Sequence, residues 1–433
     1  MKRPVIGAVA LAASGLLLLS ACAGSGSSAS GDAEPITLTV MSATIVEDPD
    51  GKAEQAMADA YMKENPNVKI EFIGTPMNEM YAKLTAMATG GQVPDVFTNS
   101  PEFSSQADDL GVVEPLDDLL GADYIAGFEE APLAQAQLND QTQFAPFFTI
   151  PTGLLYRTDL FEEAGVEPPT TWDEFIDVAQ ELTVDTDGDG ATDRWGFAMV
   201  GSNNGSGGSR FIPIMRSFGA QELVADGDGW ATEFDTEAEA AAFQLYGDLV
   251  NTYKVVPPGP LQTSYAEAFT LMATDKAAMM VTGPHSIGAI YAVNPELKGK
   301  LAGVPLPHAP GEEPSAALGM LGFSISSSSE NKEVAADYLK FILSKKNQLA
   351  WNEATGRLPT RSDAAADPQI QRPELAGFLD AQQYAFAFPP VPYYPNIQVI
   401  AAEQYQAVIT GQATAEQAAK TAGERTQTEI DNG

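Results

Sequence analysis

The stretch DTDGDGATD contains side chains that could hold a metal ion. Aligned with a calcium-binding loop of the EF-hand type, its carboxylates occupy positions one, three, five and nine: Asp185, Asp187, Asp189 and Asp193. Ala191 could add its backbone carbonyl at position seven, whereas Gly196 stands at position twelve, where a bidentate glutamate is usual. Four carboxylates this close repel one another, so the loop is a candidate site for a structural calcium ion, and no other cofactor is expected. The alternative is an acidic surface turn, which Asp-Gly pairs also form.

A second reactive group is the only cysteine of the 433 residues, Cys22. Lys2 and Arg3 precede an apolar stretch over residues 5–19, which is too short to span a bilayer comfortably and is typical of an export signal. Its ending, LSAC, resembles the lipobox of bacterial lipoproteins. The resemblance implies that the Cys22 thiol takes a diacylglycerol and that a peptidase cuts before it. The alternative is an ordinary signal peptide beside a free, buried cysteine.

These features predict a signal peptide over residues 1–21 and a flexible Ser/Gly-rich tether over residues 22–35. Two acyl chains give firm attachment to a bilayer. No later segment has enough uninterrupted apolar residues to span a membrane. We therefore expect the chain on the extracytoplasmic face of the cell membrane, held there by its lipid alone.

The remaining residues, about 400, are enough for two domains. The whole chain has 59 acidic and 23 basic residues, which gives a net charge of −36. A surface this acidic argues against binding to nucleic acid or to anionic lipid. We expect a well-solvated body that is a monomer.

Strand and helix patterns alternate near the start of this body. Period-two and helical spacings predict the order β-α-β-α-β over residues 36–41, 52–63, 68–73, 78–89 and 94–98. That order implies a parallel sheet with helices on both faces. Later helices are expected after Thr171, which forms a capping box with Glu174, and after Asn331. The fold class is α/β, with two lobes.

An ordered set of segments resembles the extracellular solute-binding proteins of ABC sugar importers, the family 1 group that includes maltose-binding protein. The segments are GGQVPDVFTN (90–99), LLYRTDLFEEAGVEPPTTWDEF (154–175), DKAAMMVTGPH (275–285), LGFSISSSSENKEVAADYLKFILS (321–344) and GRLPTR (356–361). Each segment is weak by itself, but their order is specific, and together they cover most of the chain.

The resemblance implies a type II periplasmic-binding-protein-like fold, in which two lobes joined by three chain crossings hold a ligand in the cleft between them. The crossings are expected near residues 145–149, 280–282 and 343–345. One lobe would then comprise 36–146 with 281–342, and the other 147–280 with 344–433. Such lobes close on a ligand that touches both, and the permease of the importer can recognise the closed state. A lipid tether would raise the effective concentration of the receptor near that permease.

Sugars require aromatic faces for their C–H surfaces and planar polar groups for their hydroxyls. His285 follows Gly-Pro at the place where many sugar binders of this family have a stacking tryptophan. Residues after the carboxyl ends of strands are also expected to reach a ligand. The full candidate set is Glu47, Asp48, Asn99, Glu102, Phe103, Phe148, Arg210, Tyr265, His285, Gly319, Met320, Tyr393 and Tyr394.

Other functions remain open from the sequence alone. The same fold could bind a polyol, a glycerol phosphodiester or a polyamine, and a cationic ligand would suit Glu47, Asp48 and Glu102 together. A surface glycan hydrolase would need a defined carboxylate pair or a nucleophile with its base. No Gly-x-Ser-x-Gly motif is present, and His285 and His308 are the only histidines. We therefore expect a binding protein and not an enzyme.

Overall fold

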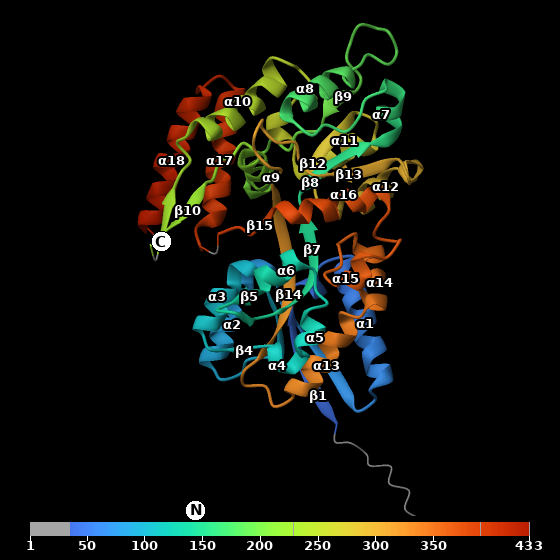
Figure 1. Cartoon of the computed structure of the whole chain (residues 1–433), viewed down its shortest axis with the longest axis vertical. Coiled ribbons are helices and arrows are strands. Elements are labelled where there is room, and N and C mark those ends of the chain that lie inside the picture. Colours follow the sequence, from blue (N-terminus) through green and yellow to red (C-terminus); the bar gives the residue numbers. More distant parts are fainter. Residues whose placement is uncertain (1–34, 228, 390, 433) are drawn as a thin grey trace, which may run out of the picture.

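The structure is a computed structural model that describes residues 35–227, 229–389 and 391–432 (Figure 1). The predicted signal peptide, Cys22 and the tether up to residue 34 lie outside the described residues. None of the described helices combines the length and the apolar character needed to cross a bilayer.

The first lobe, at the bottom of Figure 1, is built on a seven-stranded sheet of order β15-β14-β3-β1-β2, with β4 and β7 also paired to β14. Its strands are β1 (Ile36–Ser42), β2 (Val68–Gly74), β3 (Val96–Asn99), β4 (Val113–Glu114), β7 (Ala145–Pro151), β14 (Ala316–Ser326) and β15 (Ala385–Phe386). β1 pairs in parallel with β2 and β3, as the β-α-β-α-β pattern predicts, and β14 runs antiparallel to β3 and β7.

The main helices of this lobe are α1 (Asp50–Glu64), α2 (Met77–Thr89), α3 (Pro101–Asp109), α13 (Lys332–Ile342) and α14 (Lys345–Thr355). Shorter elements are α4 (Asp117–Leu120), α5 (Ala122–Ile125), α6 (Glu130–Ala136), α15 (Ser362–Ala365) and the hairpin of β5 (Gln137–Leu138) and β6 (Gln141–Thr142). The five predicted elements from residue 36 to residue 98 are confirmed, with ends that differ by at most two residues.

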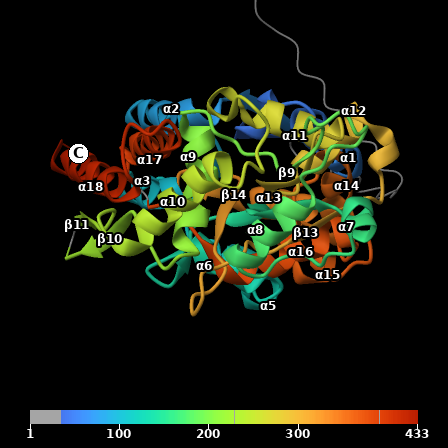
Figure 2. The same ribbon diagram turned by 90° about the horizontal axis from the view of Figure 1, so that it is seen from above.

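The second lobe has a four-stranded sheet of order β13-β8-β12-β9. Its strands are β8 (Gly153–Arg157), β9 (Trp195–Phe197), β12 (Ala277–Thr282) and β13 (Leu301–Val304), and a separate hairpin is formed by β10 (Leu223–Asp226) and β11 (Gly229–Thr232). Its helices are α7 (Thr158–Ala164), α8 (Trp172–Glu181), α9 (Gly205–Arg216), α10 (Glu237–Asn251), α11 (Tyr265–Ala273), α12 (Ser286–Val293), α16 (Pro373–Ala381), α17 (Tyr394–Ile409) and α18 (Ala415–Asn432). Figure 2 shows α17 and α18 at one end of the molecule, beside α9 and α10.

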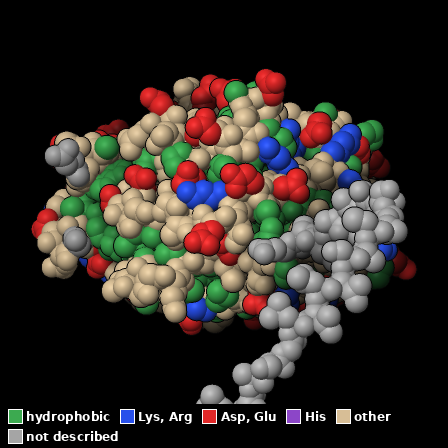
Figure 3. Space-filling model, turned by 90° about the horizontal axis from the view of Figure 1, so that it is seen from below, with side chains coloured by type: hydrophobic (Ala, Val, Ile, Leu, Met, Phe, Trp, Pro, Cys, Tyr) green, Lys and Arg blue, Asp and Glu red, His purple; other side chains and the backbone are tan. Residues whose placement is uncertain are grey.

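Each lobe encloses its own hydrophobic core. One core contains Leu38, Phe147, Tyr338 and Trp351, whereas another contains Phe175, Phe211, Tyr246 and Tyr405. Acidic side chains are spread over the face of the molecule seen from below, and basic ones are few there (Figure 3).

The first predicted crossing falls on β7, which begins in the first lobe and runs toward the second (Figure 1). The predicted lobe boundary at 146/147 is too early, because β7 pairs with β14 through Pro151 and both Phe147 and Phe148 lie in the first-lobe core. The second was misplaced: β12 pairs with β8 and β9, and β13 pairs with β8, so the chain stays in the second lobe through Val304. It returns to the first lobe along β14, which pairs with β7. The assignment of residues 281–342 to the first lobe is therefore corrected for the part before β14.

The third predicted crossing, at residues 343–345, was also wrong. Helix α14 begins there but stays in the first lobe, where the Trp351 ring lies 4.5 Å from the ring of Phe147 between centroids. The chain enters the second lobe only beyond α15, since α16 packs on β13 (Figure 1). A helical period identifies a helix but does not say which sheet the helix covers.

Capping follows the prediction at one helix and departs from it at another. Thr171 accepts a hydrogen bond from the Glu174 backbone N–H, and the Glu174 carboxylate accepts one from the Thr171 N–H, which completes the predicted capping box of α8. Asn331 occupies the N-cap position of α13, but its side chain makes no capping hydrogen bond. Asn331 Nδ2 instead donates to Asp95 Oδ1 at 3.4 Å.

Candidate ligand-binding cleft

A cavity of about 400 Å³ lies where the two lobes face each other. Its lining comes from α2 and α3 of the first lobe, from the crossing strands β7 and β14, and from the chain around the start of α17 in the second lobe. In Figure 1, α17 lies in the upper lobe above α2 and α3 of the lower lobe, and in Figure 2, seen from above, the three helices lie over the same part of the molecule. The lining residues are Met77, Glu102, Phe103, Gln106, Phe148, Ile150, Gly319, Met320, Leu321, Arg357, Phe388, Pro389, Val391, Pro392, Tyr394, Pro395 and Gln398. We call this space the cleft cavity.

Helix α3 supplies two polar side chains to the cleft cavity. Glu102 and Gln106 stand four residues apart, which places them on the same face of the helix. Gln106 Oε1 is buried and has no hydrogen-bond partner among the described residues. Burial raises the pKa of Glu102, because an ionised carboxylate loses hydration there. Both groups can accept hydrogen bonds from hydroxyl groups of a ligand.

Arg357 brings a fixed positive charge to the same cavity. Its Nη2 lies 3.1 Å from Glu47 Oε2 and forms a second ion pair with Asp50. Its guanidinium also lies over the Phe148 ring, 4.4 Å from the ring centroid. The two carboxylates therefore hold the guanidinium in place and neutralise much of its charge.

Aromatic rings form much of the remaining wall. The Phe148 ring stacks on the buried Trp351 at a centroid distance of 5.8 Å. In the second lobe, Phe388 packs on Tyr394 at 5.0 Å. The Tyr394 hydroxyl donates to the fully buried Glu222 carboxylate, so only the ring of this tyrosine is available to a ligand. Burial beside Glu222 raises the pKa of Tyr394 well above its usual value.

Six of the predicted ligand residues line the cleft cavity: Glu102, Phe103, Phe148, Gly319, Met320 and Tyr394. The others do not. Asn99 is buried and donates from Nδ2 to Ser324 Oγ at 2.9 Å, so it ties two strands together. Asp48 is exposed and pairs with Lys52, and Glu47 reaches the cavity only through its ion pair with Arg357. Tyr393 packs against the core of the second lobe.

Three further predicted residues form a separate group beside the cavity. Tyr265 Oη lies 2.9 Å from His285 Nε2, and the guanidinium of Arg210 lies 4.1 Å from the centroid of the Tyr265 ring. Burial, together with the charges of Arg210 and Arg357, lowers the pKa of His285 to about 3, so its imidazole is neutral at ordinary pH. The backbone of Gly356 (φ +73°), which follows α14, approaches this group closely, since a Cβ there would lie 3.2 Å from His285 Cα.

The sequence reasoning missed the other lining residues, and two of them could have been found. Gln106 follows Glu102 by one helical turn, so the period of α3 predicts that both face the same way. Arg357 lies inside the GRLPTR segment that supports the family resemblance. Phe388 and Val391 come from a proline-rich stretch without a period and carry no such signal.

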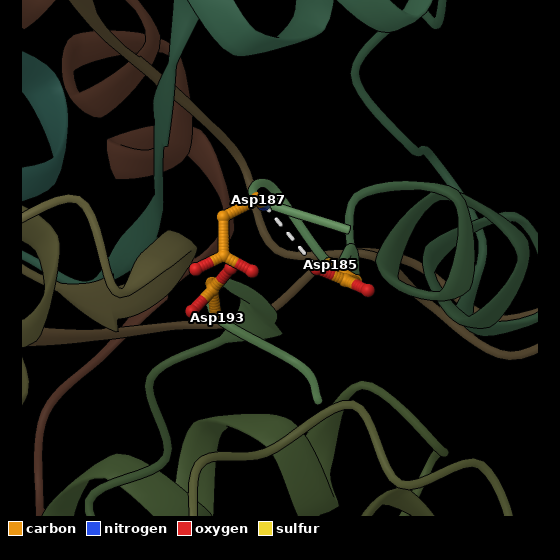
Figure 4. A group of neighbouring side chains, drawn as sticks. All are labelled: Asp185, Asp187 and Asp193. Atoms are coloured by element: carbon orange, nitrogen blue, oxygen red, sulfur yellow. Dashed lines mark hydrogen bonds between the residues drawn. The ribbon is translucent and has the colours of Figure 1, made fainter. Parts of the chain in front are cut away.

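The acidic loop lies on the second lobe, away from the lining of the cleft cavity. Asp185, Asp187 and Asp193 each offer an oxygen within 4.8 Å of the others (Figure 4). Asp189 is not part of this group, and its Oδ1 accepts a hydrogen bond from the Ala191 N–H at 2.8 Å. Three carboxylate oxygens suit a hard cation, so the donor set fits calcium in part, and the ion remains a prediction.

Comparison with known proteins shows the family. The model of the bacterial extracellular solute-binding proteins matches residues 46–349, more than half of the chain. The chain therefore belongs to the bacterial extracellular solute-binding proteins, and the motif resemblance to the receptors of ABC sugar importers is confirmed.

Relatives and solved structures agree with this assignment. The chain is 25% identical to the maltotriose-binding protein of Pyrococcus abyssi, over 78% of this chain and 70% of that protein. It is 23% identical to the diacetylchitobiose binding protein DasA of Streptomyces coelicolor, over 83% of each. The GacH receptor of Streptomyces glaucescens, solved unliganded and with acarbose, shares the fold with a TM-score of 0.74 and 23% identity, over 92% of this chain and 99% of that one.

Proposed function

We propose that the protein captures a sugar or oligosaccharide in the cleft cavity and delivers it to the permease of an ABC importer. The family and the sugar ligands named for its relatives support this proposal. The observation that carries it is Gln106 Oε1, a buried acceptor that has no partner among the described residues and lies one helical turn after Glu102. An unsatisfied buried acceptor is costly, and a ligand hydroxyl would remove that cost.

The walls of the cavity suit the two surfaces of a sugar. Hydroxyl groups can donate to Glu102 and Gln106, and a C–H face can lie on the ring of Phe388. Gln398, on α17, offers an amide from the opposite lobe. A ligand that contacts α3 and Gln398 together binds the closed arrangement better than the open one, so it favours closure. The permease would bind the closed conformation in preference to the open one.

Anchoring through Cys22 is the second part of the proposal. The lipobox-like LSAC sequence supports it, and the Ser/Gly-rich tether would let the lobes reach a permease in the same membrane. Metabolic labelling with an alkyne fatty acid tests this part. Wild type should take up label and sediment with membranes, whereas Cys22→Ser should do neither; an equally labelled Cys22→Ser variant would contradict the anchor.

The contacts of Glu47 and Asp48 do not support the cationic ligand that the sequence left open. Glu47 pairs with Arg357 and Asp48 pairs with Lys52, so neither carboxylate is left to join Glu102 around an amine. A neutral ligand rich in hydroxyl groups fits this charge arrangement better.

A thermal-shift screen of neutral mono- and oligosaccharides, polyols and amines tests the proposal. At least one sugar should raise the melting temperature, because a ligand that binds only the folded state stabilises it by mass action. Gln106→Ala should lose most of this shift, and Gln244→Ala, an exposed glutamine on α10, should keep it. A screen in which only amines raise the melting temperature would overturn the sugar assignment.

A further inference from the structure

We infer that the cleft cavity is built for a glycoside whose sugar carries an apolar substituent, such as an aromatic aglycone. The inference rests on the proposed sugar binding and narrows its ligand class. Of the 17 residues that line the cavity, 11 have side chains without polar hydrogen-bonding groups, which are Met77, Phe103, Phe148, Ile150, Met320, Leu321, Phe388, Pro389, Val391, Pro392 and Pro395. A sugar alone would leave many of its hydroxyls against such surfaces without partners, at a cost for each.

Polar and apolar lining residues are partly separated among the elements. Helix α3 contributes Glu102 and Gln106 beside the apolar Phe103. Residues 388–389 and 391–395 contribute five apolar side chains and the ring of Tyr394, and Gln398 on α17 is the polar side chain nearest to them in sequence. The crossing strands add Ile150, Met320 and Leu321 without a polar side chain. This separation predicts a ligand with a hydroxyl-rich end at α3 and an apolar end at the segment 388–395.

The apolar character of that segment is fixed by the groups behind it. Tyr394 could have presented its hydroxyl to the cavity, but the hydroxyl donates to Glu222. Glu222 is held in turn by two hydrogen bonds from Arg216, at 2.9 and 2.8 Å. Arg216 lies over the Phe386 ring, 3.8 Å from its centroid. Buried charges in such a network are costly to rearrange, so the hydroxyl stays away from the ligand.

Size and adaptability also fit a substituted sugar. A volume of about 400 Å³ lies within the range of roughly 300–1,000 Å³ for pockets that hold drug-sized ligands. Met77 and Met320 place flexible thioethers in the wall, and such side chains adjust to irregular apolar groups. The cavity therefore has room and a compliant surface for a ring beyond the sugar.

Calorimetric titration with matched glycosides tests the inference. For glucose, galactose and maltose, the methyl glycoside is compared with the phenyl glycoside of the same anomer. Burial of the phenyl ring should tighten binding roughly 10- to 100-fold over the methyl compound for at least one sugar. Methyl and phenyl glycosides of equal affinity would overturn the inference and leave the proposed sugar binding intact. If none of these glycosides bound, both the inference and the proposed sugar binding would be contradicted.

Two variants separate the ends of the ligand. Val391→Ser, in the apolar segment, should weaken the phenyl glycoside several-fold more than the methyl glycoside. Gln106→Ala, on α3, should weaken both by the same factor. Val391 is partly exposed and lies in a loop, so its substitution should not prevent folding, which unfolding in urea checks. An equal loss for both glycosides in Val391→Ser would contradict the assigned orientation.

Discussion

Two groups of carboxylates in this molecule have opposite environments. In the first lobe, burial raises the pKa values of Asp50, Glu54 and Glu102. In the acidic loop of the second lobe, hydrogen bonds from backbone N–H groups and from Thr186 lower the pKa values of Asp185 and Asp193. The loop satisfies its own exposed carboxylates, whereas the carboxylates near the cleft are costly to ionise. Of these three carboxylates, only Glu102 lines the cleft cavity, where a hydrogen bond from a ligand can offset the cost.

The strongest case is Glu54, which is 1% exposed. Its Oε2 accepts hydrogen bonds from Ser42 Oγ and Thr44 Oγ1, both at 2.7 Å, but Oε1 is buried without a partner among the described residues. Burial is the main cause that raises its pKa from 4.5 to about 7, and the charge of Asp50 adds to it. Of the carboxylates compared, Glu54 should therefore have the largest effect on the pH dependence of stability.

The free energy of unfolding of the wild type should decrease as pH rises, and Glu54→Gln should abolish this decrease. The unfolded chain releases this proton near pH 4.5 and the folded chain only near pH 7, so the free energy of unfolding should fall across that window and then level off. The difference corresponds to about 3 kcal/mol at pH 8. Urea unfolding at pH 5 and pH 8 measures it, with Glu64→Gln on the exposed end of α1 as the control. A variant with the same pH slope as wild type would contradict the burial argument.

Substitutions at the cleft should act on ligand affinity instead of folding. Glu102→Gln should weaken sugar binding by roughly 10-fold or more, since a hydrogen bond to a charged acceptor contributes about 1.5–3 kcal/mol. In the wild type, affinity should also fall as pH decreases through the raised pKa of Glu102, because protonation removes the negative charge of the acceptor. Calorimetry at pH 5 and pH 8 checks both effects. Affinity independent of pH and of Glu102→Gln would place this carboxylate outside the binding site.

His285 should make stability fall in acid. Its pKa is lowered from 6.5 to about 3 in the folded chain, so below pH 6.5 the unfolded chain takes up a proton that the folded chain refuses. The melting temperature of wild type should therefore drop more steeply between pH 6.5 and pH 4 than that of His285→Gln. Equal slopes in the two proteins would show that the imidazole is not shielded. The other histidine provides the control variant, His308→Gln.

The acidic loop should give the smallest effect. Its carboxylates are exposed and already hydrogen bonded, so removing one changes folding little. If the loop binds calcium, added CaCl₂ should raise the melting temperature of wild type but not of Asp187→Asn, with Asp226→Asn as the control. Identical melting curves in CaCl₂ and in EDTA would leave the loop as an acidic surface turn.

The sequence predicted the parts of the fold that depend on local periodicity. Elements from Ile36 to Asn99 and the Thr171 cap follow from spacing and side-chain chemistry alone. The positions of the second and third crossings could not be predicted in this way, because the return through β14 depends on which strands pair across large separations in sequence. The cavity shows the same limit: α3 has a helical period that relates Gln106 to Glu102, whereas Phe388 and Val391 lie in a proline-rich stretch with none. The direction of the Tyr394 hydroxyl depends on Glu222, far away in the chain.

A crystal structure with a stabilising sugar, grown at the pH of the thermal-shift screen, measures directly where the ligand binds. We expect the sugar in the cleft cavity, with a hydroxyl donating to Gln106 Oε1 and with Gln398 of the opposite lobe in contact. Sugar density elsewhere on the protein, with Gln106 Oε1 still unpartnered, would contradict the proposed site.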